Sequence, residues 1–219
     1  MMRLIVDGQG IEAVEGKSVL EACLDNGIYV PNLCFMKGMK KPPASCRLCF
    51  VEIEGKSRPV VSCKVEATEG MIVRTDTQAV RRLQRTALRL LLSAHDADCR
   101  NCPSNKKCDL QRMVKLLGVR LRPRRLPHLD PEKTLPQDHP LFEILASRCV
   151  LCGKCVTTCR ARNGRSLLTF AGRGFNTVIS AWGGENPASY PCDGCLACLE
   201  ACPVSAIMLK KDRSFQLEV

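Results

Sequence analysis

Two cysteine runs in the last third of the sequence constrain the fold more than any other feature. Each run has the spacing C-x2-C-x2-C-x3-C, and 32 residues separate the two runs. This spacing is typical of a pair of [4Fe-4S] clusters, because three thiolates of a run face one cluster and the fourth reaches the other. We therefore predict one cluster held by Cys149, Cys152, Cys155 and Cys202, and another held by Cys192, Cys195, Cys198 and Cys159.

Structural zinc is the competing interpretation of these runs. Zinc ribbons use tetrahedral four-cysteine sites built from C-x2-C knuckles, and such a site gains nothing from a third cysteine at x2 followed by a fourth at x3. Pro203 follows the second run, whereas Arg160 stands at the equivalent place after the first. Because that proline shapes the exit of the loop and is not a ligand, the departure leaves the predicted ligands unchanged.

The first part of the chain is expected to form a small sheet with one helix. Residues 2–6 and 11–14 are predicted strands joined by a turn, Ser18 begins a helix with Glu21 completing a capping box, and Asn26-Gly27 ends it. The strand-like segments LCFVEIEG, PVVSC and GMIVRTD follow, which suggests a β-grasp sheet. Within it lie four cysteines spaced C-x11-C-x2-C-x13-C, namely Cys34, Cys46, Cys49 and Cys63. This spacing differs from the plant-type pattern, and zinc remains an alternative for these four residues.

An amphipathic helix is predicted from about residue 76 to residue 94. Its apolar face repeats at helical spacing through Val80, Leu83, Ala87, Leu90 and Leu91, and arginines fill the other side. The helix leads into the pattern H-x3-C-x2-C-x5-C. Three cysteines there lack a fourth ligand, and only the histidine is near enough to complete the set of His95, Cys99, Cys102 and Cys108. A zinc site with the same mixed ligands is the competing interpretation.

These motifs resemble the N-terminal cluster region of iron-only hydrogenases. The N-terminal spacing also resembles that of the large peripheral-arm subunit of respiratory complex I and of NAD-dependent formate dehydrogenases. The resemblance covers nearly the whole chain with all four motifs in order, and it is closest to the hydrogenases, which also pair two complete cysteine runs. It implies one [2Fe-2S] cluster on Cys34, Cys46, Cys49 and Cys63, and a [4Fe-4S] cluster on His95, Cys99, Cys102 and Cys108, which brings the total to three [4Fe-4S] clusters.

The predicted fold class is α+β, divided among three cluster modules and a linker. We expect a β-grasp [2Fe-2S] ferredoxin-like domain over residues 1–75 and a small helical [4Fe-4S] module over 76–119 with one histidine and three cysteine ligands. A Pro/Arg-rich linker over 120–140 leads to a bacterial-type two-[4Fe-4S] ferredoxin domain over 141–219.

A few residues fall outside the four ligand sets. A short helix is expected over residues 109–118, capped by Gly118. His128 and His139 have no cysteine at ligand spacing, so we interpret both as structural. Of the sixteen cysteines only Cys23 has no cluster, and it lies on the apolar face of the first predicted helix.

The charge balance argues against nucleic-acid binding. The formal net charge is +11, but the thiolates of four clusters bring about seven negative charges and leave about +4 in the oxidised protein. Aromatic residues are only 4% of the chain, so few stacking platforms exist for bases. The N-terminus has no signal-peptide core, and no stretch is long enough to span a membrane. We therefore expect a cytoplasmic protein.

We predict an electron-transfer subunit without catalytic residues of its own. The resemblance implies two partners in a larger complex, a flavin subunit that oxidises NAD(P)H and a catalytic subunit such as a hydrogenase or a ferredoxin-linked oxidoreductase. The sequence after Cys202 is too short for the catalytic domain of the hydrogenases, so a stand-alone subunit is expected. Electron bifurcation and a soluble ferredoxin partner stay open. The alternatives are the corresponding subunit of a formate dehydrogenase or complex I-like assembly, and a zinc-bound interaction protein.

Overall fold

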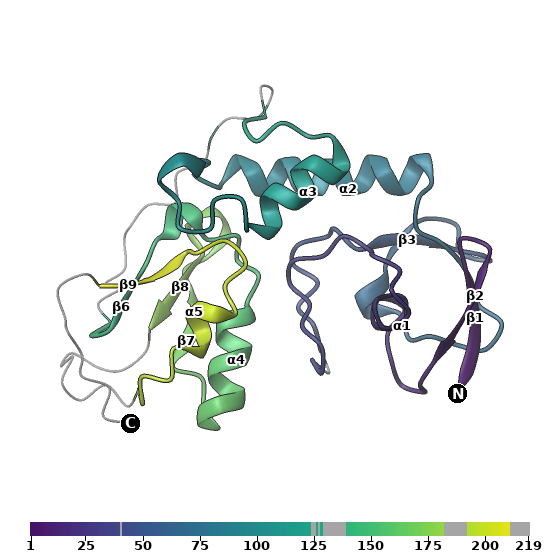
Figure 1. Cartoon of the computed structure of the whole chain (residues 1–219), viewed down its shortest axis with the longest axis horizontal. Helices are drawn as coiled ribbons and strands as arrows, with labels where there is room; N and C mark the ends of the chain where they lie inside the picture. The colour runs from purple at the N-terminus through teal and green to yellow at the C-terminus, as the bar shows by residue number, and fades with distance from the viewer. Residues whose placement is uncertain (40, 124–125, 127, 129–138, 182–191, 211–219) are drawn as a thin grey trace. The chain divides into compact units, whose positions relative to one another are not determined.

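The computed structural model describes residues 1–219 except 40, 124–125, 127, 129–138, 182–191 and 211–219. The chain divides into two compact units, each with helices and strands, so the predicted α+β class is confirmed (Figure 1). Unit 1 comprises Met1–Ser93 and Asp109–Pro127, and unit 2 comprises Ala94–Cys108 and His128–Val219. The four domain boundaries stay a prediction, and much of the expected linker lies outside the described residues.

Unit 1 is built on a five-stranded sheet with the strand order β2-β1-β5-β3-β4. Strand β1 pairs antiparallel with β2 and parallel with β5, while β3 is antiparallel to both β5 and β4. The strands are β1 (Met2–Val6), β2 (Gln9–Ala13), β3 (Phe50–Ile53), β4 (Val60–Val61) and β5 (Ile72–Arg74). This mixed sheet is ferredoxin-like, as the sequence predicts.

The first hairpin is tighter than its sequence suggests. The expected turn spans four residues, but Asp7 and Gly8 alone make it, with φ of 50° and 83°. Two successive residues at positive φ form the type I′ turn whose twist suits antiparallel strands, and Asp-Gly supplies it readily. Strand β2 therefore begins at Gln9 and not at residue 11.

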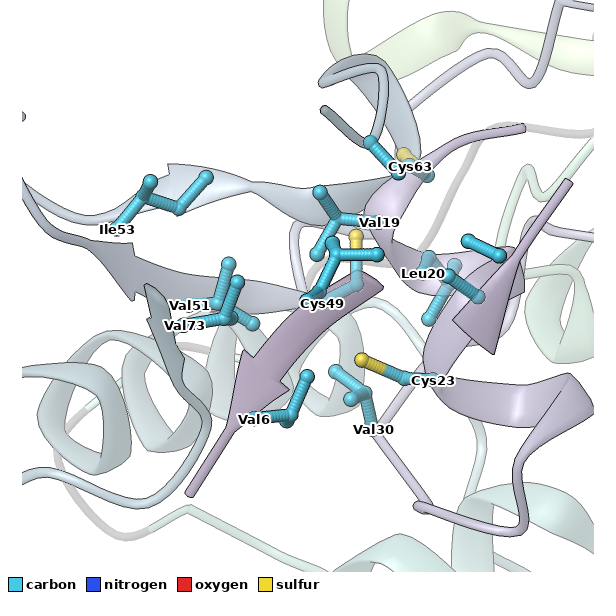
Figure 2. Packing of buried hydrophobic residues seen from close by; sticks show 14 of the residues in the cluster. Val6, Val19, Leu20, Cys23, Val30, Cys49, Val51, Ile53, Cys63 and Val73 are labelled. Atoms are coloured by element: carbon cyan, nitrogen blue, oxygen red, sulfur yellow. The ribbon is translucent and has the colours of Figure 1, made fainter. Parts of the chain in front are cut away.

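Helix α1 (Val19–Asp25) packs its apolar face into the core of unit 1. The Ser18 side chain accepts a hydrogen bond from the backbone N–H of Glu21 at 3.2 Å, which confirms the predicted N-cap. Cys23 is fully buried in this core, among apolar side chains from the sheet and the helix (Figure 2). The large apolar side chains of the core are Leu4, Val6, Ile11, Val19, Leu20, Val30, Phe35, Val51, Ile53 and Val73.

Helix α2 (Gln78–Ser93) contacts strand β3 and helix α3 (Asp109–Leu117). Its predicted apolar face is wrong at one position, because Leu90 is 57% exposed while Leu88 and Leu92 are buried. Gln84 is also buried, and its side-chain N–H donates to the Phe50 carbonyl at 3.2 Å. This hydrogen bond satisfies the side-chain N–H of Gln84, whereas its Oε1 has no hydrogen-bond partner among the described residues. An apolar pattern does not reveal this buried polar residue. Helix α3 ends before Gly118 as predicted.

Unit 2 contains two small antiparallel sheets and two short helices around the cysteine runs. Strand β6 (Phe142–Ile144) pairs with β9 (Ile207–Leu209), and β7 (Leu168–Ala171) pairs with β8 (Val178–Ala181). The helices are α4 (Lys154–Asn163) and α5 (Ala197–Glu200). The sequence suggests a strand through GFNTVIS, but its first three residues form a 3-10 turn and only its last three, Val178 to Ser180, lie in β8. The loop expected after it lies mostly outside the described residues.

Within the described part of the chain, none of the helices has both the length and the apolar character needed to cross a membrane.

Candidate metal centres

All sixteen predicted ligands lie in the described part of the chain, and none of the cysteines there forms a disulfide. The four N-terminal cysteines lie in unit 1. The histidine, its three cysteines and both C-terminal runs lie in unit 2. Each predicted ligand set is therefore contained in one unit.

The four predicted ligand thiols of unit 1 form two pairs. The sulfurs of Cys34 and Cys46 are 3.4 Å apart, and their hydrogen bond lowers the pKa of Cys34 to about 6 by stabilising its thiolate. In the same way a hydrogen bond from Cys63 lowers the pKa of Cys49 to about 7. The pKa values of Cys46 and Cys63 are raised, because each shares a proton with its partner and is buried. Two thiol pairs suit a [2Fe-2S] cluster, in which each of two irons takes two of the four cysteines.

Two serines that the sequence analysis did not single out lie beside these pairs. Ser45 directly precedes Cys46, and Ser62 directly precedes Cys63. The Ser62 hydroxyl donates to the Cys49 carbonyl oxygen at 2.8 Å, and Ser62 is completely buried. In the sequence, the only sign of this arrangement is the dipeptide Ser-Cys at residues 45–46 and 62–63.

His95 is buried and held in a single orientation. Its Nδ1 lies 2.9 Å from the Arg148 carbonyl oxygen, which can only accept a hydrogen bond, so Nδ1 carries the proton and Nε2 is free to bind a metal. Burial lowers the pKa of His95 below its usual value, which favours the neutral imidazole that metals require. The side chain fits the predicted role of ligand, although the complete set with Cys99, Cys102 and Cys108 stays a prediction.

The two C-terminal runs bring thiols from both runs near one another. Burial, with smaller contributions from the nearby thiols of Cys152 and Cys202, raises the pKa of Cys149 to about 12. Burial likewise raises the pKa of Cys198 to about 11, with contributions from Cys192 and Cys159. The last cysteine of each run therefore lies close enough to the other run to affect the pKa of a thiol there. This is expected if each cluster takes its fourth ligand from the other run.

The loops of the two runs share one backbone conformation. Positive φ occurs at the second residue after the first cysteine, in Leu151 and Gly194, and again two residues later, in Gly153 and Leu196. Each run therefore uses glycine at one of the two positions and leucine at the other. Such turns direct successive N–H groups toward a central anion. The N–H of Leu151 lies 3.4 Å from the Cys149 sulfur, which is the contact expected of a loop that holds a thiolate.

Among the described residues, no three histidine, cysteine, aspartate or glutamate side chains are grouped so that they could hold one metal ion. A structural zinc site brings four donors to a single ion. A [2Fe-2S] cluster takes two cysteines at each of its two irons, and a [4Fe-4S] cluster takes one ligand at each iron.

Comparison with known proteins agrees with this chemistry. Residues 1–78 match a family described as a 2Fe-2S iron-sulfur cluster binding domain. Residues 84–122 match the NADH-ubiquinone oxidoreductase-G iron-sulfur binding region. The chain carries a 2Fe-2S domain and a 4Fe-4S binding region. The coarser part of the cofactor prediction is thereby confirmed, while the count of three [4Fe-4S] clusters and the two-cluster C-terminal domain stay predictions.

Relatives and one solved structure extend the similarity over the whole chain. The chain is 34% identical over 212 residues to the NADH-quinone oxidoreductase G 2 subunit of Rhizobium meliloti (strain 1021), covering 95% of this chain and 24% of that protein. It is 30% identical over 218 residues to the HndD subunit of the NADP-reducing hydrogenase of Solidesulfovibrio fructosivorans, covering 95% and 36%. The crystal structure of an NAD+-reducing [NiFe]-hydrogenase in its H2-reduced state superposes with a TM-score of 0.85 at 29% identity, covering 96% of this chain and 88% of that one.

The resemblance stated from the sequence is confirmed, since hydrogenase and NADH oxidoreductase subunits are among the relatives. The chain spans about a quarter to a third of the length of the curated relatives it matches.

Proposed function

We propose that this chain is an iron–sulfur electron-transfer subunit of an NAD(P)H-linked oxidoreductase complex. One [2Fe-2S] and three [4Fe-4S] clusters, bound by the four predicted ligand sets, supply its one-electron redox chemistry. The observation that carries the proposal is the crossed association of the two C-terminal runs, with Cys202 beside Cys149 and Cys159 beside Cys198. This arrangement supports a pair of [4Fe-4S] clusters, because in two-cluster ferredoxins the fourth cysteine of each run binds the other cluster.

In this proposal, the protein's own residues bind the clusters, orient the ligands and shield the thiolates. Paired thiols in unit 1 and crossed thiols in unit 2 provide thiolates, and loops with positive φ turn backbone N–H groups toward them. The Arg148 carbonyl fixes the His95 ring so that Nε2 faces away from this hydrogen bond. A neutral histidine adds no charge where a cysteine would add one, so its cluster should have a higher reduction potential than an all-cysteine cluster.

Contacts inside unit 2 support an order for the electron path. His95 donates to the carbonyl of Arg148, and the Cys108 sulfur lies 3.8 Å from the Pro203 carbonyl oxygen. Arg148 directly precedes Cys149 and Pro203 directly follows Cys202, and these two cysteines belong to the same predicted set. The contacts therefore support a path between the set of His95 and the set of Cys149, with the set of Cys192 beyond it.

The names of the relatives suggest which partner subunits this chain would have. Their names describe subunits of an NADH-quinone oxidoreductase, an NADP-reducing hydrogenase and an NADPH-Fe(3+) oxidoreductase. We infer that this chain relays electrons in the cytoplasm between a flavin subunit that oxidises NAD(P)H and a catalytic subunit, such as a hydrogenase or a ferredoxin-linked oxidoreductase. A formate dehydrogenase or a complex I-like assembly would use the same relay.

Metal and sulfide analysis tests the proposal directly. Chain purified without oxygen should contain about 14 iron and about 14 acid-labile sulfide per polypeptide, the sum for one [2Fe-2S] and three [4Fe-4S] clusters. Reduction should produce electron paramagnetic resonance signals of both cluster types. Stoichiometric zinc without acid-labile sulfide would refute the proposal and favour a structural metal protein.

A matched pair of variants links the clusters to particular thiols. Cys192→Ser should lower the iron content by up to about four per chain, since it removes a ligand of one [4Fe-4S] cluster. Cys23→Ala should leave iron and sulfide unchanged, because Cys23 is buried in an apolar core and has no place in a ligand set. Loss of iron in both variants would instead indicate general misfolding.

A further inference from the structure

Ser62 directly precedes Cys63 in the chain and contacts Cys49, so it touches both ligands of one thiol pair. It follows strand β4 directly and precedes Cys63 in the chain, and none of its surface is exposed. Its backbone N–H and its hydroxyl both reach the Cys49 carbonyl oxygen, at 2.9 Å and 2.8 Å. One carbonyl oxygen thus receives two donors from a single residue, and both belong to the segment that carries the partner ligand.

The hydroxyl has a second acceptor within reach. The Ser62 side chain also forms a hydrogen bond with the Cys49 thiol, which helps to lower the pKa of that thiol. A serine hydroxyl has one proton, and the backbone N–H of Ser62 already satisfies the carbonyl oxygen. The hydroxyl proton can therefore turn to the sulfur without leaving the carbonyl unpaired. A thiolate is the stronger attraction for it, because hydrogen bonds to charged acceptors are about twice as strong as neutral ones.

Ser45 provides a natural comparison within the same centre. It precedes Cys46 as Ser62 precedes Cys63, and its side chain forms a hydrogen bond that helps to lower the pKa of the Cys34 thiol. Ser45 is exposed to solvent, whereas Ser62 is not. Water screens the dipole of an exposed hydroxyl, so the same contact should influence the cluster less from Ser45 than from Ser62.

We propose that Ser62 is a positioning residue whose hydroxyl donates to the Cys49 thiolate and raises the reduction potential of the [2Fe-2S] cluster. The inference rests on the proposed function, because it assumes a cluster on this quartet. Reduction adds one electron to the cluster and increases the negative charge on its sulfur ligands. A buried donor to one of those sulfurs stabilises the reduced form more than the oxidised form.

Redox titration of the complete cluster-loaded chain measures the effect. The [2Fe-2S] signal is followed by electron paramagnetic resonance at a temperature where [4Fe-4S] signals are broadened. Ser62→Ala should lower the equilibrium constant for one-electron reduction about tenfold, which corresponds to about 59 mV. Ser45→Ala should change it by less than about threefold, because that hydroxyl is screened. A Ser62→Ala chain with intact cluster absorbance and an unchanged potential would overturn the inference.

A second measurement needs no change at Ser62. In the Ser45→Ala chain, a brief exposure to D2O exchanges hydroxyl protons but not the slowly exchanging backbone N–H groups of the sheet. Proton hyperfine spectra of the reduced [2Fe-2S] cluster should then lose one strong coupling, that of the Ser62 hydroxyl. If no coupling is lost, the inference fails even if Ser62→Ala does not assemble its cluster. A chain without iron and sulfide would instead refute the proposed function itself.

Discussion

Removing iron and sulfide should unfold unit 2 while unit 1 keeps its sheet. The two units contain nearly equal lengths of chain, so folding costs them similar conformational entropy. Their described apolar cores are unequal. One hydrophobic cluster of unit 1 contains ten large apolar side chains, whereas the corresponding cluster of unit 2 contains five: Phe142, Ile144, Leu168, Ile179 and Ile207.

The difference is large enough to decide which unit survives. Each fully buried large apolar side chain contributes about 1.5–3 kcal/mol, which gives about 15–30 kcal/mol for unit 1 and about 8–15 kcal/mol for unit 2. The deficit of about 8–15 kcal/mol equals the whole stability of a typical domain. Each cluster also contains two predicted ligands, Cys49 and Cys63 in unit 1 and Cys155 and Cys198 in unit 2, so it is the number of apolar side chains that distinguishes the two units.

Hydrogen exchange read by mass spectrometry checks this expectation. The chain is stripped of iron and sulfide with a chelator and a reductant under anaerobic conditions, and peptides from both units are compared. Backbone amides of β6 and β9 should exchange near the rate of an unfolded chain, while those of β1 and β5 stay protected. Rebuilding the clusters should restore protection in β6 and β9. Full protection of these two strands in the stripped chain would refute the reasoning.

Five further substitutions test three particular features of the two units. Leu88→Ala should reduce the free energy of unfolding by about 3 kcal/mol and Leu90→Ala by less than about 0.5 kcal/mol, because only Leu88 is buried; chemical denaturation distinguishes them. Gly172→Ala should lose more thermal stability than Gly174→Ala, since both have positive φ but only at Gly172 would a Cβ meet a backbone oxygen, at 2.2 Å. Burial lowers the pKa of His139 from 6.5 to about 4, so the folded protein resists protonation there. Its free energy of unfolding should therefore decrease by about 2 kcal/mol as the pH falls from 6.5 toward 4. His139→Phe should show a smaller loss between pH 7 and pH 4.5 in denaturation experiments, and an equal loss would contradict this assignment.

Features that depend on neighbouring residues could be predicted from the sequence. The Ser18 cap and the Gly118 stop follow from fixed spacings, and the structure agrees with both. The spacing of the cysteine runs likewise predicts that the last cysteine of each lies near the other run. The face of helix α2 was harder to predict because leucines crowd residues 88–92, and several registers fit an apolar stripe equally well. A long-range hydrogen bond from Gln84 to the Phe50 carbonyl accompanies the observed register, and no local pattern contains that information.

Long-range contacts also explain why the His95 loop belongs to unit 2. The sequence joins this loop to the helices before and after it, both of which lie in unit 1. Its own hydrogen bonds go elsewhere, from the backbone N–H of Asp96 to the Ser147 carbonyl at 2.6 Å and from His95 to the next carbonyl. Both acceptors lie just before Cys149, about fifty residues downstream. The H-x3-C-x2-C-x5-C spacing predicts His95 as a ligand, but only the fold shows that its loop contacts the segment just before Cys149.

The backbone of the cysteine loops indicates why the clusters would be needed for folding as well as for function. Every described non-glycine residue with positive φ lies in such a loop except Asp7, and these residues are Ala44, Arg47, Lys106, Leu151, Leu196 and Ser205. A non-glycine residue in this region costs about 1–3 kcal/mol. Four of the six are in unit 2, which also has the smaller apolar core. Strain is therefore concentrated in the unit least able to offset it by burial, and metal–thiolate bonds are the interaction strong enough to hold these loops. If Leu151→Gly and Leu196→Gly increase the stability of the stripped chain more than that of the loaded chain, this account of the loops is correct; equal effects in both forms would contradict it.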